Sequence, residues 1–346
     1  MRNALEIDGA EGEGGGQLVR TAVALSAITG MPIRVHNIRA KRAPPGLAPQ
    51  HVAAVQAVAA LCTASIEGAT MRSATLEFVP GPLAPGEFAF NVGTAGSIAL
   101  VLQALLPAMV RALGACRVRV TGGTDVRAAP PVDYFRNVLL PLLARMGVVT
   151  ECMVRRRGYY PRGGGEVEIR TGVSHLQPLL LDRPDKPAAI DGLAHVSNLP
   201  SHIPERMRGA ALARLARTRV PAKIEEQVLS EAIGQGGAIV LWAHTEEAVL
   251  GAGRVAERGV RSEALGEAVA AEIAADLAAG ATLDVHAADQ MLVWLALARG
   301  DSSFATREIT PHAATAMWLI ERFLPARFDV RREPGLTRVQ VRVPTA

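Results

Sequence analysis

The sequence predicts an α+β protein in which a βαβαββ unit is repeated, with a smaller α/β segment inserted between the second and third copies. The main observation is a recurrence: the glycine-rich turn at Gly16 returns as a small-residue turn at Gly96, and the helix start at His51 returns at Asp133. Both pairs give a period of roughly 80 residues, which is too long for a solenoid and fits duplicated sub-domains. A third, partial copy lies at the end of the chain. Between 182 and 277 the pattern of polar and apolar residues differs from that of the repeated units.

Hydrophobic periodicity and turn residues define the elements of the first two units. A short strand ending near Asp8 leads through glycines into a helix over 17–29, which Gly30 ends. The first unit is completed by a strand over 32–38, a helix over 50–61 and two strands within 65–79. The second unit is expected to contain a helix over 98–113, a strand over 116–121, a helix over 133–146 and then strands.

The remaining chain divides into the closing copy and the inserted segment. The closing copy is expected to hold helices over 289–298 and 312–324 and a hairpin with strands 328–331 and 338–343. The inserted segment combines a polar helical run over 204–217, a β-rich run over 237–244 and an Ala/Glu-rich helix over 262–279. We therefore expect triplicated βαβαββ sub-domains forming one large domain from 1–181 and 278–346, with 182–277 as a smaller inserted α/β domain.

The composition is that of a well-packed globular protein, with 49% hydrophobic and 20% charged residues in a chain of 346. Aromatic residues make up 4%, which argues against base stacking on an aromatic surface as the main way of binding nucleic acid. The net charge of +4 and the pI of about 9.3 are compatible with a polyanionic partner.

Cysteine usage and hydropathy predict the compartment. Cys62, Cys116 and Cys152 form no CxxC pair, so reduced thiols are expected in place of disulfides or a metal site. No basic-then-apolar signal opens the chain. The most apolar run, 98–110, contains Gln103 and Pro107 and falls short of the roughly 18 residues that a membrane span needs. We expect a soluble cytoplasmic protein with no membrane partner.

The glycine-rich segment 9–16 gives the first indication of function. Glycines let backbone N–H groups approach a ligand closely, and the N-terminus of the following helix favours an anion. Glu11 and Glu13 lie inside this segment, where a bare phosphate cradle would not place acids. The pattern predicts a site that handles phosphate together with a cation or a nearby basic cluster.

A basic cluster follows in the same unit. Its members are Arg20 in the first helix, Arg39, Lys41 and Arg42 after the next strand, and Gln50 and His51 at the start of the second helix. Arginine binds phosphate bidentately, and Pro44–Pro45 stiffen the loop. The local sequence fits either a phosphate-binding cluster or a solvated surface loop. Segment 155–166, with four arginines, two tyrosines and a glycine triplet, likewise fits a polyanion-binding loop or a basic β-hairpin.

Two polar residues near the end of the chain are candidates for chemistry. Asp289 opens an otherwise apolar helix, where a capping role is the plain alternative to a functional one. His312 follows Pro311 at another helix start, where free backbone N–H groups disfavour the imidazolium and favour a neutral, nucleophilic ring. A purely structural histidine remains the alternative. The sequence has no P-loop, no dinucleotide fingerprint and no GxSxG motif, so the ordinary ATPase and dehydrogenase classes are excluded.

These residues occur in stretches that resemble the RNA 3′-terminal phosphate cyclases. In family order they are IDGAEGEGGGQLVRTAVALS (7–26), IRAKRAPPGLAPQH (38–51), GTAGSIALVLQALLP (93–107), GGTDVRAAPPVDYF (122–135), RRGYYPRGGGEVE (156–168), SNLPSHI (197–203), HAADQ (286–290) and TPHAAT (310–315). The family fold, three βαβαββ units with one smaller inserted domain, agrees with the pattern described above. The resemblance implies a ligase that uses ATP to convert an RNA 3′-phosphate into a 2′,3′-cyclic phosphate through histidyl–AMP and RNA(3′)pp(5′)A intermediates.

The resemblance also implies roles for individual residues. His312 matches the nucleophile that carries AMP, and Pro131 and Tyr134 match the apolar side facing the adenine. The rest of the nucleotide pocket would be Gln103, His286, Ala287, Ala288, Asp289 and Gln290. The active-site and RNA-end residues would be Glu13, Arg20, Arg39, Arg42, Gln50 and His51, with Arg39, Arg42 and Gln50 binding the substrate. Mg²⁺ or Mn²⁺ is expected, with Glu13 as its ligand, and a homodimer is left open.

Two other classes of protein are alternatives to the cyclase. Cyclase-like ribosome-assembly proteins share this fold and bind RNA without adenylylation, but they lack the nucleophilic histidine, which His312 supplies here. An enolpyruvyl transferase built on a related repeat is disfavoured by the histidine motif and by the loops that match the RNA end.

Overall fold

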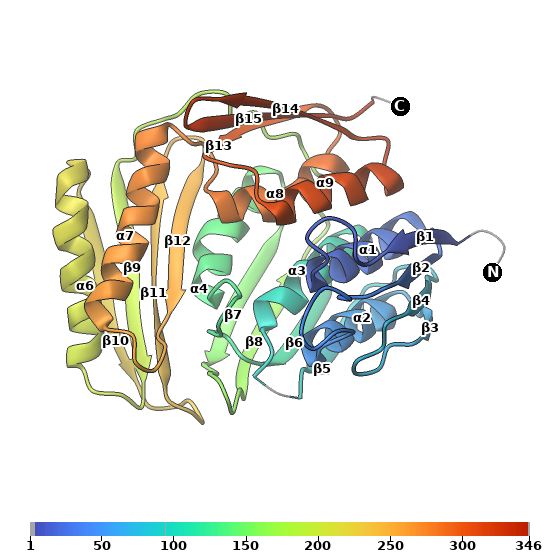
Figure 1. Ribbon diagram of the computed structural model, residues 1–346, viewed down its shortest axis with the longest axis horizontal. Helices are drawn as coiled ribbons and strands as arrows, with labels where there is room; N and C mark the ends of the chain where they lie inside the picture. The colour runs from blue at the N-terminus through green and yellow to red at the C-terminus, as the bar shows by residue number, and fades with distance from the viewer. Residues whose placement is uncertain (1–3, 94, 345–346) are drawn as a thin grey trace.

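The computed structural model describes residues 4–93 and 95–344, so Thr94 of the 93–107 stretch lies outside it. The chain is a mixed α+β protein in which four small sheets are combined with helices (Figure 1). None of the helices in the described ranges has both the length and the apolar character to cross a membrane.

The first sheet is formed by residues 5–79. Its elements are β1 (Leu5–Asp8), α1 (Gly16–Thr29), β2 (Ile33–His36), α2 (Pro49–Leu61), β3 (Ser65–Glu67) and β4 (Leu76–Val79). The strand order is β1-β2-β4-β3, with β1 and β2 parallel and the other pairs antiparallel. The parallel pair is connected by α1, as a crossover connection requires. Gly30 ends α1 in the left-handed conformation, as the sequence predicts.

The second sheet repeats this connectivity. Its elements are β5 (Gly86–Asn91), α3 (Ile98–Arg111), β6 (Cys116–Gly122), α4 (Val132–Tyr134), the π-helical turn η1 (Phe135–Leu139), α5 (Leu140–Arg145), β7 (Thr150–Arg156) and β8 (Gly165–Thr171). The order β5-β6-β8-β7 has the same pattern of one parallel and two antiparallel pairs. The helix expected over 133–146 is present as the consecutive pieces α4, η1 and α5.

The third sheet follows the same pattern with one strand fewer. Its elements are α8 (Val285–Leu297), β13 (Ser302–Thr306), α9 (Pro311–Phe323), β14 (Arg327–Glu333) and β15 (Leu336–Arg342). The order is β13-β15-β14. Leu180 forms a parallel bridge with Ser303 of β13, which is the position that a first strand occupies in the other two sheets.

One helix start differs from the expectation. Helix α8 begins at Val285, because the Asp284 side chain accepts hydrogen bonds from the His286 and Ala287 backbone N–H groups. The capping role considered for Asp289 is therefore wrong, since Asp289 lies within the helix.

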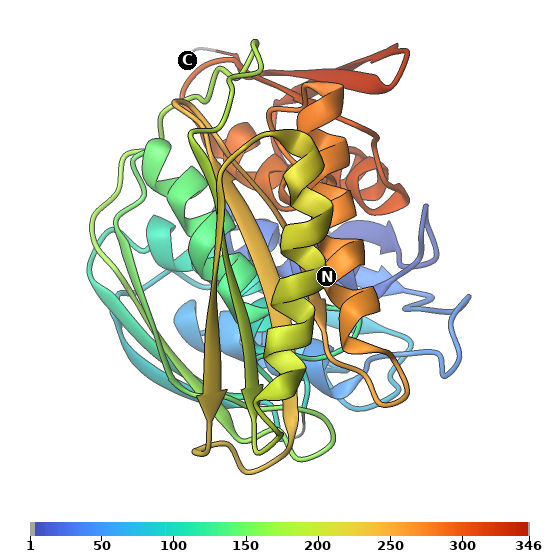
Figure 2. The same cartoon turned by 90° about the vertical axis from the view of Figure 1, so that its left-hand side faces the viewer.

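The fourth sheet is built from the middle of the chain. Its elements are β9 (Ala189–Ser197), α6 (His202–Leu215), the 3-10 turn η2 (Ala216–Thr218), β10 (Ala222–Leu229), β11 (Gly236–His244), β12 (Val249–Val255) and α7 (Ser262–Ala279). The order is β10-β9-β11-β12. Helices α6 and α7 lie side by side over this sheet (Figure 2), and Met207, Ile239 and Val269 belong to a hydrophobic cluster of its own.

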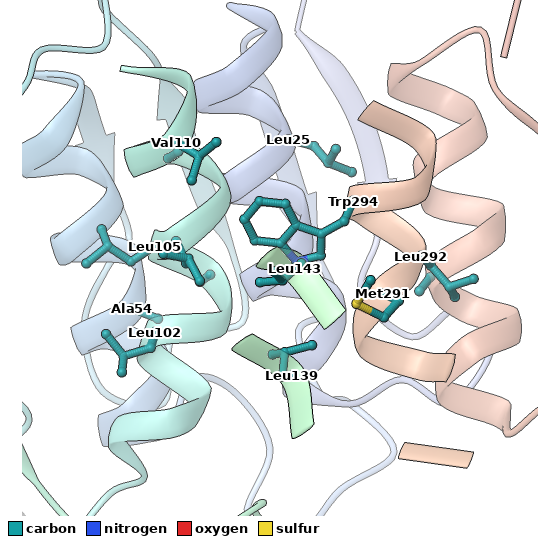
Figure 3. Close-up of a cluster of buried hydrophobic side chains, with 14 of the residues drawn as sticks. Leu25, Ala54, Leu102, Leu105, Val110, Leu139, Leu143, Met291, Leu292 and Trp294 are labelled. Carbon is teal, nitrogen blue, oxygen red and sulfur yellow. The ribbon is translucent and has the colours of Figure 1, made fainter. Parts of the chain in front are cut away.

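Helices of the first three sheets pack together in the interior. Trp294 of α8 lies among Leu25 of α1, Leu105 of α3 and Leu143 of α5 (Figure 3), and all four belong to the largest hydrophobic cluster. Helix α1 also packs against α9. This packing brings the loop before α1 and the first turn of α9 together, although they come from opposite ends of the chain.

Candidate active site

The glycine-rich loop before α1 is shaped by close neighbours. Gly12 has a φ of +55°, and a Cβ atom there would overlap the Thr315 hydroxyl. A Cβ atom on Gly16 would overlap the ring of His51 at its Nε2 atom. Glycine is required because side chains from α9 and α2 occupy the space that a larger residue would need.

Gly16→Ala is expected to destabilise the fold by about 1–3 kcal/mol, because the added methyl group must displace the buried His51 ring. Chemical denaturation measures this change, and the double variant Gly16→Ala/His51→Ala should recover part of the loss. Gly209→Ala is the matched control, since Gly209 lies in α6 with nothing near its added Cβ atom. Equal stability of Gly16→Ala and the wild type would contradict this packing.

Glu13 connects three segments of the chain. One carboxylate oxygen forms an ion pair with Arg42 of the basic loop, and Oε2 lies 3.2 Å from Nδ1 of His312. The Glu13 backbone N–H donates to the Thr315 hydroxyl at 3.1 Å, across 302 positions of sequence. The carboxylate therefore joins the glycine-rich loop, the basic loop and the histidine of α9.

His312 lies in the first turn of α9. Thr310 caps this helix by accepting a hydrogen bond from the Ala313 N–H at 2.9 Å, and the His312 side chain is 47% exposed. Partial burial lowers the pKa of His312 below its usual value; Arg20 and Arg42 lower it further, while Asp289 opposes them. These shifts favour the neutral form of the ring. A proton on Nδ1, facing Glu13, would leave Nε2 as a free nucleophile.

The influence of Asp289 on His312 predicts a pH effect. Asp289→Asn removes the negative charge that favours the imidazolium, so the pKa of His312 should fall further. Titration of the His312 ring by NMR measures the shift. Arg20→Met should move the same pKa upward, and two shifts of the same sign would contradict the assigned electrostatics.

Arg20 is buried and has no hydrogen-bond or ion-pair partner in the described part of the chain. Its side chain is 7% exposed, and burial lowers its pKa to about 10, so it remains charged at neutral pH. It borders a cavity between α1, α3 and α8, together with Gln103, Asp289 and Gln290. A buried, unpaired guanidinium beside a cavity is suited to binding an anion.

The residues expected to form the nucleotide pocket lie along α3 and α8. Gln103 donates to Gln290 at 2.6 Å, and Asp289 accepts the Thr310 hydroxyl at 2.7 Å. Burial raises the pKa of Asp289 to about 6. Nε2 of His286 lies 2.9 Å from a carboxylate oxygen of Glu272, while Ala287 and Ala288 are buried.

Pro131 and Tyr134, the residues expected on the apolar side of the adenine, lie at the start and end of α4. The Tyr134 hydroxyl donates to Asp284 at 2.7 Å, and its buried ring meets the His286 ring edge-on. Pro131 is buried next to Gly253 of β12. Tyr134 thus supports the start of α8, while Pro131 packs against β12, and neither residue lines the cavity beside Arg20.

The basic loop is fixed by its own side chains. Arg39 donates to the backbone carbonyls of Pro44 and Gly46 at 3.0 and 2.7 Å. Lys41 donates to the Ala10 carbonyl at 2.8 Å, which ties this loop to the glycine-rich loop. Arg39 thus holds the loop in shape, while Arg42 faces Glu13.

The start of α2 contributes two further residues. His51 is buried, and its Nδ1 accepts the Ala48 N–H at 3.0 Å. Burial, reinforced by Arg20 and Arg39, lowers the pKa of His51 to about 3, so the ring is neutral. Gln50 accepts the Ser97 N–H at 3.4 Å and thereby contacts the start of α3.

The arginine-rich segment 155–166 is a hairpin in which three of the four arginines face internal partners, while Arg162 is exposed. Arg155 binds Glu168, Arg156 binds the Gly164 carbonyl, and Arg157 pairs with Asp133. These contacts favour the β-hairpin interpretation over a loop that binds a polyanion.

Four supporting residues were not singled out from the sequence: Thr310, Thr315, Asp284 and Glu272. Thr310 and Asp284 each precede an apolar helix, which is the usual signal of an N-cap. Nothing local in the sequence distinguishes Thr315 or Glu272, because their contacts come from distant segments.

A histidine held by a carboxylate, beside a buried arginine with no partner in the described ranges, is an arrangement suited to phosphoryl or nucleotidyl transfer. The family model for RNA 3′-terminal phosphate cyclase matches residues 11–330. The chain is 54% identical to the RNA 3′-terminal phosphate cyclase of Nitrosospira multiformis, over 97% of this chain and 96% of that protein. It is 43% identical to the protein of the same name from Pyrobaculum neutrophilum, over 95% of each chain. The chain therefore belongs to the RNA 3′-terminal phosphate cyclase family.

A solved structure of a different enzyme is only distantly similar. The enolpyruvyl transferase NikO from Streptomyces tendae aligns with 97% of this chain and 48% of its own, at 12% identity and a TM-score of 0.41. This score is too low to support a shared fold or activity.

Proposed function

We propose that this protein is an ATP-dependent ligase that converts an RNA 3′-terminal phosphate into a 2′,3′-cyclic phosphate. The observation that carries the proposal is the pair of His312 and Glu13, with the unpartnered Arg20 bordering the adjacent cavity. Family membership over nearly the whole chain supports the same activity.

The reaction has three displacements. A ring nitrogen of His312 attacks the α-phosphorus of ATP, pyrophosphate leaves, and histidyl–AMP forms. An oxygen of the RNA 3′-phosphate then attacks this phosphorus and releases His312, which gives RNA(3′)pp(5′)A. Finally, the neighbouring 2′-hydroxyl attacks the 3′-phosphorus, AMP leaves, and the cyclic phosphate closes. Adenylylation provides the leaving group that a phosphate monoester lacks, and the adjacent hydroxyl gains from proximity.

The contacts suggest how the roles are divided. Glu13 orients His312 and keeps a proton on Nδ1, so that Nε2 is the attacking atom. Arg20 is suited to a substrate phosphate because its guanidinium has no partner within the described residues, with Arg42 and Gln50 at the RNA end. Arg39 and His51 shape the basic loop and α2. Gln103 and the 286–290 motif, backed by Pro131 and Tyr134, form the nucleotide side.

A divalent cation, Mg²⁺ or Mn²⁺, fits the edge of this site. Glu13 is the acidic group beside His312, and Mg²⁺ is commonly held by one or two carboxylates together with substrate phosphates. The ion would neutralise charge on the triphosphate. Glu13 would then have to exchange one of its present partners, Arg42 or His312, for the ion.

We also propose the domain organisation that the sequence predicts. The repeated strand orders and the Leu180–Ser303 bridge support three related units in residues 1–181 and 278–346. The separate hydrophobic cluster over α6, α7 and the fourth sheet supports 182–277 as an inserted domain. We also propose a cytoplasmic location and a homodimer.

The activity is tested with an oligonucleotide that carries a radiolabelled 3′-phosphate. Incubation with ATP and Mg²⁺ or Mn²⁺ should make the label resistant to phosphatase, and omission of ATP should prevent this. RNA binding without conversion would support instead a cyclase-like RNA-binding protein. Conversion without ATP would exclude the adenylylation route.

Arg20→Ala is expected to slow cyclisation of the 3′-phosphate oligonucleotide by roughly 10²-fold, because one preorganised cationic donor is lost. Formation of the protein–AMP adduct should persist in part, since the role assigned to Arg20 concerns the RNA phosphate. Arg258→Ala, at an exposed position on the loop after β12, is the matched control. Normal cyclisation by Arg20→Ala would remove Arg20 from the phosphate site.

A further inference from the structure

A second group of chemically distinctive side chains lies outside the site around His312. Asp125 follows β6, Asp133 lies in α4 and His195 lies in β9, and each is at most 3% exposed. The group therefore joins the second sheet to the fourth sheet in the interior of the protein. None of the three residues has a role in the proposed cyclisation.

These residues leave polar atoms without hydrogen bonds. In the described residues, eight buried side-chain oxygen and nitrogen atoms lack a hydrogen-bond partner, and four of them belong to this group. They are Oδ1 of Asp125, both carboxylate oxygens of Asp133 and Nε2 of His195. Buried polar atoms are normally satisfied, so this concentration indicates a missing partner common to all of them.

The distances between His195 Nε2 and the two carboxylates fit ligands around a shared metal ion better than hydrogen bonds donated by a protonated histidine. Nε2 of His195 lies 3.7 Å from Asp125 Oδ1 and 3.5 Å from Asp133 Oδ2, and one ligand atom from each residue falls within 4.8 Å of the others. Both separations exceed the roughly 2.7–3.2 Å of a usual N–H···O hydrogen bond. Ligands bound at 2.0–2.2 Å around a tetrahedral ion are about 3.4 Å apart, so small movements would complete the coordination.

The surrounding contacts orient the candidate ligands. Nδ1 of His195 is 3.2 Å from the Tyr159 hydroxyl, which in turn is 2.9 Å from the Ser197 hydroxyl, so Nε2 is directed at the carboxylates. Asp125 Oδ2 accepts the Thr124 hydroxyl at 2.7 Å, which leaves Oδ1 for a ligand. Hydrogen bonds of this kind, to the far side of each ligand, are typical of metal sites.

Arg157 is the one basic side chain in direct contact with both carboxylates among the described residues. Its NH1 lies 2.6 Å from Asp133 Oδ2, without an aligned hydrogen bond, and 3.4 Å from Asp125 Oδ2. Arg136 also contacts Asp133, with its NH2 3.5 Å from Oδ1, so two arginines face the two carboxylates. Among the described residues, Oδ1 of Asp125 and Nε2 of His195 still have no hydrogen-bond partner, and these two atoms remain to be satisfied.

We propose that Asp125, Asp133 and His195 form a structural site for a divalent transition-metal ion of the zinc type. Two carboxylate oxygens and an imidazole nitrogen are ligands that Zn²⁺ accepts, with a fourth position left for water. The ion would fasten β9 of the 182–277 segment to the loop after β6 and to α4. The site is separate from the divalent cation expected with ATP, and it does not depend on the proposed cyclase activity.

The test uses the full chain without an affinity tag and without ATP. The protein is stripped with a chelator, equilibrated with Zn²⁺, dialysed against metal-free buffer and analysed for bound metal. We expect one zinc ion per chain and a higher melting temperature than that of the stripped protein. When Co²⁺ replaces Zn²⁺, its absorption spectrum should be that of cobalt bound by nitrogen and oxygen ligands.

Variants locate the ion. Asp125→Asn and His195→Gln should each lose the bound zinc and the rise in melting temperature. Glu13→Gln should retain both, as should Asp191→Asn, which alters β9 outside the group. Absence of zinc from the wild-type chain, which would indicate a proton on His195 in place of a metal, overturns the proposal. Zinc retained in full by folded Asp125→Asn and His195→Gln would overturn it as well.

Discussion

Replacing His312 by alanine is expected to reduce the rate of RNA 3′-phosphate cyclisation by roughly 10³-fold or more, because the covalent route loses its nucleophile. The fold should be unaffected, since the side chain is about half exposed and its one ion-pair contact is with Glu13 at the surface of the site. Steady-state conversion of a 3′-phosphate oligonucleotide measures the effect.

The control for this variant is His175→Ala, which removes an exposed histidine far from the site in sequence. It should cyclise at the wild-type rate. One further substrate separates the steps: the pre-activated RNA(3′)pp(5′)A end needs no histidyl–AMP, so His312→Ala should still close it. Loss of that closure as well would show that His312 acts in more than adenylylation.

Glu13→Gln is expected to slow the overall reaction by on the order of 10²-fold or more, because the carboxylate that orients the imidazole is lost. Unlike alanine, glutamine keeps the volume of the side chain, so the packing of Gly15 and Thr315 around it should survive. The defect should appear in adduct formation, where the orientation of His312 and the divalent ion both matter. Single-turnover labelling with ATP at several metal concentrations measures it.

Glu11→Gln is the matched control for Glu13→Gln. Glu11 lies two positions earlier in the same loop and is exposed, without an ion pair in the described part of the chain. The two substitutions make the same change in net charge. An equal loss of activity in both variants would mean that the overall charge of the loop matters and that the contact between Glu13 and His312 does not.

Local signals in the sequence were sufficient to predict most of the helices. The end of α1 at Gly30 and the start of α9 at Pro311 follow from residues that favour these positions in any helix. The same logic gave the wrong start for α8, because Asp289 and Asp284 both precede apolar residues and only Asp284 receives the backbone hydrogen bonds. Strands β9, β10 and β12 were not predicted, since their alternation is weak and β12 contains two glycines.

The arrangement of the site was harder to predict than the helices, because it depends on tertiary packing. The sequence identified Glu13, Arg42 and His312 as separate candidates, and a single packing of α1 against α9 joins them. The sequence could not distinguish Arg39, whose guanidinium binds its own loop, from Arg20, whose guanidinium has no partner among the described residues. Arg20 follows the glycine-rich segment and Arg39 precedes two prolines, and neither setting indicates which charge is already satisfied in the folded chain.

The most direct test of the account is to label the wild-type protein with α-³²P-ATP and Mg²⁺ or Mn²⁺ in the absence of RNA. We predict a covalent adduct that is labile in acid and stable in base, as a phosphoramidate is, and that maps to the peptide containing His312. No adduct on the active wild-type enzyme, or an adduct undiminished by His312→Ala, would contradict the central claim that His312 carries AMP.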